Sequence, residues 1–173
     1  KSPLRTLAPA KMIQSPWGGR IFSVGLLTLL LPLSAKAQEQ NRVWITGRVF
    51  WDRTSDNWDE GSPWVNGNTA EFNEGTGIVL IPDRVSASGL VFNTTATIAD
   101  GSITLSGTSP SISVASGETA TIGSELELDT LGNLTIVNTD TAGDAAHTGD
   151  AGIVILSGTS DFDGTTTITR NAW

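Results

Sequence analysis

The side chains that could perform chemistry are few, and most lie near the end of the chain. The single histidine, His147, lies in a polar stretch together with Asp140, Asp144 and Asp150. A Ser-His-Asp triad needs a serine at a strained turn, and the sequence has no Gly-x-Ser-x-Gly motif. The three carboxylates could supply oxygen ligands to Ca²⁺, but the EF-hand spacing and the Gly-Gly-x-Gly-x-Asp nonapeptide are both absent. We therefore expect a solvated loop here, with no metal and no cofactor.

A second pair of carboxylates, Asp161 and Asp163, lies two residues apart. On a strand the two side chains would share one face, and glycoside hydrolysis uses such paired acids. Carboxylates that alternate beside a turn are more often solvating groups, so we expect no catalytic residue and no enzyme. A fragment of a β-helical polysaccharide-degrading enzyme remains an alternative. Because the chain has no cysteine, disulfides and thiolate-ligated metals are excluded.

Tryptophan is concentrated in one short segment. Four of the six tryptophans fall within 21 residues: Trp44, Trp51, Trp58 and Trp64. Exposed indole rings could form a platform that stacks on sugars, which would make this segment a carbohydrate-binding module. Buried rings would instead form a hydrophobic cap on the end of a neighbouring core. We favour the cap and keep the carbohydrate-binding module as the alternative.

The charge of the chain is divided very unevenly. The first 37 residues hold five of the ten basic residues and no acidic one, whereas the remainder has five arginines against all 18 acids, a net charge of −13. A surface this acidic repels phosphate backbones, so no nucleic-acid partner is expected. It also favours solubility of an exposed protein.

The basic N-terminal segment has the features of a secretory signal. An apolar run of 13 residues, 21–33, is too short to span a bilayer comfortably and is followed by Ala35-Lys36-Ala37. We expect residues 1–37 to be an upstream extension and signal peptide, with cleavage between Ala37 and Gln38. A short membrane anchor is the alternative. The mature protein would then be secreted or displayed at a cell surface.

Residues 38–83 contain many turn formers between the tryptophans, which predicts short strands and tight turns rather than helix. We expect strands at 43–51, 69–72 and 78–81. Together they would form the Trp-rich N-terminal cap.

Residues 84–173 show a different pattern, in which apolar residues alternate over short runs separated by Gly, Ser, Thr, Asn and Asp. The alternating pairs are Leu90/Phe92, Ile103/Leu105, Ile112/Val114, Ala120/Ile122, Leu126/Leu128 and Leu134/Ile136. A period of two is typical of a strand with one buried face, so the fold class is all-β. The denser run 153–156 predicts a strand that is buried on both faces.

Short strings also recur within this segment. Leu-Ser-Gly-Thr-Ser occurs at 105–109 and again at 156–160, an offset of 51. Recurring strand-plus-turn strings favour a solenoid over 84–173. The alternative is a β-sandwich, which also uses short alternating strands.

The segment 152–168 reads Gly-Ile-Val-Ile-Leu-Ser-Gly-Thr-Ser-Asp-Phe-Asp-Gly-Thr-Thr-Thr-Ile. It resembles the autotransporter-associated β-strand repeat, with Phe162 in place of the usual Tyr and Ser160 in place of the usual Asn. Residues 102–107 resemble a second, degenerate copy, and the Trp-rich opening is similar to the start of such passengers.

That resemblance implies a right-handed parallel β-helix at the outer membrane of a Gram-negative-type bacterium. It also implies a structural or adhesive stalk, with downstream coils and a translocator barrel as partners. A surface glycan or protein would be the target of adhesion. The repeat is still running at Ile168, so the solenoid is expected to be incomplete at the C-terminus.

Overall fold

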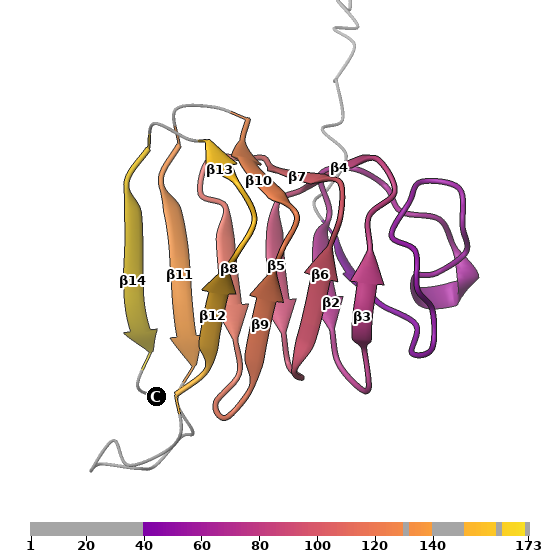
Figure 1. Ribbon diagram of the computed structural model, residues 1–173, viewed down its shortest axis with the longest axis horizontal. Helices are drawn as coiled ribbons and strands as arrows, with labels where there is room; N and C mark the ends of the chain where they lie inside the picture. The colour runs from indigo at the N-terminus through magenta and orange to yellow at the C-terminus, as the bar shows by residue number, and fades with distance from the viewer. Residues whose placement is uncertain (1–39, 130–131, 140–150, 162–163, 172–173) are drawn as a thin grey trace, which may run out of the picture. The chain divides into compact units, whose positions relative to one another are not determined.

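The computed structural model describes residues 40–129, 132–139, 151–161 and 164–171 (Figure 1). The elements in these ranges are, in chain order, β1 (Asn41–Val43), the 3-10 helix η1 (Asp59–Gly61), β2 (Thr69–Phe72), β3 (Gly77–Leu80), β4 (Arg84–Ala87), β5 (Gly89–Phe92), β6 (Ala96–Ala99), β7 (Ser102–Leu105), β8 (Ser111–Val114), β9 (Thr119–Ile122), β10 (Glu125–Leu128), β11 (Leu134–Thr139), β12 (Ile153–Leu156), β13 (Ser160–Asp161) and β14 (Thr166–Asn171). The all-β fold class is confirmed. No helix in the described ranges is long and apolar enough to cross a membrane.

The strands form three parallel sheets. Their orders are β1-β2-β5-β8-β11-β14, β13-β10-β7-β4 and β12-β9-β6-β3. From β2 onward, successive strands enter the three sheets in turn, so every third strand is a neighbour in space (Figure 1). This arrangement is consistent with a parallel β-helix or solenoid. All strand pairs in the described ranges are parallel, which argues against the antiparallel sheets of a β-sandwich.

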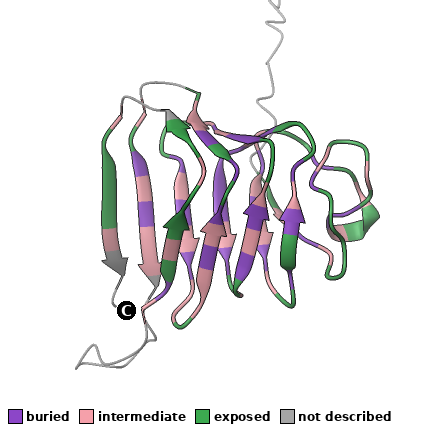
Figure 2. Ribbon diagram, in the orientation of Figure 1, coloured by how far each residue is buried: buried purple, intermediate pink, exposed green. Residues whose placement is uncertain are grey.

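The alternating apolar pairs all face one core. Because strand side chains alternate between faces, pairing in register places inward residues in columns that run from strand to strand. One column contains Ala70, Leu90, Ile112, Ile136 and Ile168. The first four are buried, and the same holds for the other predicted inward residues except Leu128, which is partly buried against the core (Figure 2).

The chain travels different distances between paired strands. Leu90 pairs with Ile112, 22 positions later, and Ile112 pairs with Ile136, 24 positions later. Ile136 then pairs with Ile168, 32 positions later, because the connection between β11 and β12 is longer than the earlier ones. The structural repeat is therefore one coil of variable length.

The recurring Leu-Ser-Gly-Thr-Ser string does not mark this repeat. Leu105 ends β7, whereas Leu156 ends β12, and the two strands lie in different sheets. The offset of 51 residues therefore does not correspond to a whole number of coils. In both places a leucine in register with a buried residue is followed by small residues.

Two predicted strands are wrong in extent or burial. The segment 43–51 is not one strand, because a turn at Thr46 and Gly47, where Gly47 has a φ of +81°, follows β1. The run 153–156 does form β12, but Ile153 and Ile155 are exposed. Ile153 and Ile155 are in register with Thr119 and Thr121, the outward positions of β9, so their side chains lie on the outer face of the sheet and not in the core.

Candidate functional site

The four clustered tryptophans form one buried group. Trp44, Trp51, Trp58 and Trp64 are each at most 3% exposed. Neighbouring indole rings have centroids 4.5–5.2 Å apart, mostly edge to face, a geometry that aromatic pairs prefer. Sugar rings cannot stack on indole faces that are already covered by protein.

This Trp group lies on the N-terminal end of the core. The rings of Trp51 and Trp58 are 5.8 and 5.9 Å from the ring of Phe72, which stacks on Phe92 at 5.0 Å. Phe72 and Phe92 are inward residues of β2 and β5. The aromatic stack therefore continues the core of the sheets into the Trp-rich segment.

The same segment supplies hydrogen-bond partners to β2, β3 and β4, one strand in each of the three sheets. β1 pairs with β2 in the first sheet, and the Trp51 amide donates to the Leu80 carbonyl at 2.9 Å beside β3. Beside β4, the Ser86 amide donates to Asn66 Oδ1 at 3.0 Å, and the Gly67 amide donates to the Ser86 carbonyl at 3.0 Å. The N-terminal strand edges thus have hydrogen-bond partners. β2 and β3, which precede Arg84, already belong to these stacked sheets.

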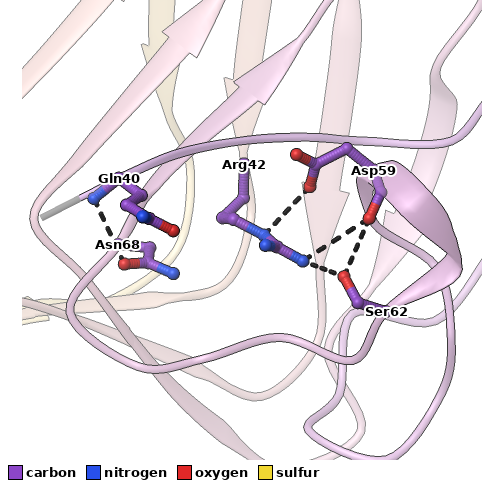
Figure 3. A network of polar contacts seen from close by, with 5 residues as sticks. All are labelled: Gln40, Arg42, Asp59, Ser62 and Asn68. Carbon is purple, nitrogen blue, oxygen red and sulfur yellow. Dashed lines mark hydrogen bonds and ion pairs between the residues drawn. The ribbon is translucent and has the colours of Figure 1, made fainter.

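A network of polar contacts around Arg42 connects η1 to β1 (Figure 3). Arg42 Nε forms an ion pair with Asp59 Oδ1 at 2.9 Å, and Arg42 Nη2 donates to Ser62 Oγ. The Ser62 hydroxyl also donates to the Asp59 carbonyl at 2.8 Å. The Arg42 side chain is mostly buried, so these contacts give its charge the partners that burial requires. The network is a structural one.

Asp52 organises the turn that follows Trp51. Its Oδ1 accepts the amides of Thr54 at 2.7 Å and Ser55 at 2.6 Å, and its Oδ2 accepts the Ser55 hydroxyl at 2.7 Å. Burial by itself raises the pKa of the Asp52 carboxyl, but the bonds donated by Thr54 and Ser55 together outweigh it, so the pKa lies below its usual value.

We expect this turn to make the protein sensitive to acid. A folded-state pKa below the unfolded one gives stability that is present above the unfolded value, near 3.8, and lost as pH falls through the folded value. Thermal unfolding followed between pH 6 and pH 2.5 should therefore show a fall in Tm below pH 4 that is smaller in Asp52→Asn. An identical fall in Tm in both proteins would show that protonation of Asp52 does not contribute to the loss of stability in acid.

A shallow polar hollow lies between the Asp52 turn and β4. It has a volume of about 340 Å³ and is lined by Arg53, Asn66, Asp83, Arg84, Thr104 and Asp129, among others. Sequence reasoning missed this site because its residues are up to 76 positions apart. One signal was available: of the five arginines in an otherwise acidic segment, two face this hollow.

The other predicted site residues cannot be placed. Ala37, Gln38, His147, Asp163 and the expected loop acids at 140, 144 and 150 lie outside the described residues. The backbone of Asp161 is in β13, in register with Glu127, but its side chain is not described. Among the described residues, no three His, Asp or Glu side chains form a group that could hold a metal ion.

No family model matches the chain, and neither a curated protein nor a solved structure matches it. The fold and the contacts described above therefore carry the functional argument.

Proposed function

We propose that residues 38–173 form the N-terminal part of a right-handed parallel β-helix that serves as a structural or adhesive stalk. The stalk is non-catalytic and belongs to an exported, autotransporter-like passenger at the surface of a Gram-negative-type bacterium. The Trp-rich segment is its N-terminal cap. Its partners are downstream coils and a translocator, with a surface glycan or protein as the target.

The observation that carries this proposal is the difference between the two ends of the stacked sheets. At the N-terminal end, the Trp group covers the core and the first strands have hydrogen-bond partners. At the other end, Ile168 occupies the inward column that begins at Ala70, yet it is 73% exposed. An inward apolar side chain that no described residue covers supports a further coil, since each coil of a solenoid buries the next.

Handedness and export complete the proposal. Parallel strands connected through other sheets nearly always wind to the right, which supports a right-handed coil.

The apolar run 21–33 with its Ala35-Lys36-Ala37 site supports export. Export is tested by N-terminal sequencing of protein taken from the surface of intact cells, which should begin at Gln38 or within a few residues. Uncleaved protein confined to the cytoplasm would refute it.

The stalk proposal predicts salt-dependent association through the open end. Residues 38–173 have a net charge of −13, which opposes contact between molecules at low ionic strength. At 0.15 M salt the Debye length is about 8 Å, so this repulsion is screened. Sedimentation velocity of residues 38–173 should therefore show association that increases between 0.05 and 0.5 M NaCl. Ile168→Lys should restore the monomer, because it places a charge on the exposed end of the core.

Ile78→Lys is the matched control. Ile78 is also exposed, but it lies on the outer face of β3, which has Phe50 on one side and β6 on the other. This substitution should leave the association unchanged. A wild-type protein that stays monomeric at 0.5 M NaCl would contradict the presence of an open end.

A further inference from the structure

We propose that the hollow beside β4 is a binding site for a neutral saccharide. It is separate from the buried Trp group and does not depend on the proposed stalk. Its volume of about 340 Å³ lies within the range of about 300–1,000 Å³ that is usual for small-molecule sites.

The strands that line the hollow are β4, through Arg84, Val85 and Ser86, and β7, through Thr104. Ser86 pairs with Thr104, which pairs with Glu127, so the three side chains form one outward column. Within the hollow itself, the outward side chains from this column are the small hydroxyl groups of Ser86 and Thr104. A flat ligand could lie across the strands there and still reach polar groups on both sides.

Several polar groups of the site are held in place before any ligand binds. Arg84 donates from Nε to Ser102 Oγ at 3.2 Å and from Nη2 to Glu127 Oε1 at 2.9 Å. Asn66 Oδ1 accepts both the Trp64 indole N–H at 3.1 Å and the Ser86 amide at 3.0 Å. Arg53 belongs to the turn that Asp52 fixes. Binding therefore costs little ordering of these elements.

Other groups of the site have no partner among the described residues. Arg53, Asp83 and Asp129 are among the residues that line the hollow, and none of their side chains forms a hydrogen bond or ion pair with the described part of the chain. Arg53 and Asp83 have opposite charges and face the same space without pairing. They supply donors and acceptors that remain available to a ligand.

The charges around the hollow determine which ligand fits. Two arginines and two aspartates line it, and the protein as a whole is strongly acidic, so an anion gains little and is repelled at long range. The described residues offer no group of three acids for a metal ion. A neutral saccharide avoids this repulsion, and each of its hydroxyls both donates and accepts. Two neighbouring hydroxyls can therefore accept hydrogen bonds from an Arg guanidinium and donate hydrogen bonds to an Asp carboxylate at the same time.

The test is a titration of the mature chain with defined saccharides. The probes are hexasaccharides of β-1,4-glucose, α-1,4-glucose and β-1,4-N-acetylglucosamine, followed by NMR chemical shifts and calorimetry. We expect saturable binding of at least one, with the shifts centred on Ser86 and Thr104. Arg53→Ala and Asp83→Asn should each weaken that binding at least tenfold.

Matched controls separate the site from general charge effects. Arg48→Ala removes an arginine from the same segment, and Asp100→Asn removes an exposed acid at a corner, and neither residue lines the hollow. Both controls should bind as the wild type does. Failure of all three hexasaccharides to bind would overturn the proposal. So would equal weakening by Arg48→Ala, or tighter binding of oligogalacturonate, inorganic phosphate or glycine. The stalk proposal would survive any of these results.

Discussion

Replacing Trp58 by alanine is expected to lower the free energy of unfolding by about 3–5 kcal/mol, the usual cost of deleting a large buried aromatic ring. Trp58 is fully buried, and its ring is within 6 Å of the rings of Trp44, Trp51, Trp64 and Phe72. Its removal would leave a cavity between the cap and the first coil. Because domains are stable by only about 5–15 kcal/mol, urea denaturation should show a large loss.

Two further variants make this result interpretable. Phe50→Ala changes an aromatic residue of the same segment that is 50% exposed, so its cost should be below about 1.5 kcal/mol. Trp58→Phe should cost less than Trp58→Ala, because it retains a ring and removes an indole N–H that has no hydrogen-bond partner among the described residues. Equal stability of Trp58→Ala and Phe50→Ala would contradict a packed cap.

Replacing Gly101 by alanine is the second change with a large expected effect. Gly101 has a φ of +49° at the corner between β6 and β7, and an added Cβ would overlap the carbonyl oxygens of Asp83 and Ile81. The left-handed backbone costs about 1–2 kcal/mol for an alanine. The overlap with backbone atoms of the preceding coil adds about 1–3 kcal/mol.

Gly117→Ala is the matched control for that substitution. Gly117 also has a positive φ, of +77°, but nothing lies within 4 Å of a Cβ added there. It should therefore lose only the backbone part, about 1–2 kcal/mol. Urea denaturation of the two variants under identical conditions measures the difference. If the two losses are equal, the coils are not packed closely at the Gly101 corner.

The individual strands could be predicted from the sequence because the period of two reports which side chains face a core. The sequence predicts strands at 69–72 and 78–81, and β2 and β3 lie there or within one residue. The pairs from Leu90/Phe92 to Leu134/Ile136 all face the core. The sequence also favours burial of the tryptophans, since an elongated stack leaves the end of its core uncovered.

The pairing of strands could not be predicted, because any short alternating strand can lie beside any other. The identical string at 105–109 and 156–160 suggested an equivalence that the sheets do not have. Coils of 22, 24 and 32 residues leave no fixed period to detect. The hollow beside β4 was missed for the same reason, since Arg53 and Asp129 meet only when successive coils are stacked in the observed register.

The variable coil length has a consequence for folding. Lengthening a closed loop from 22 to 32 residues costs only about 0.3 kcal/mol of chain entropy, far less than one buried leucine contributes. Each coil depends mainly on its two neighbours, so order can spread along the stack one coil at a time.

With the aromatic group anchoring one end, amide protection against hydrogen exchange should be greatest near β2 and β5 and least near β14. Loss of structure would therefore begin near β14 and proceed toward the tryptophans.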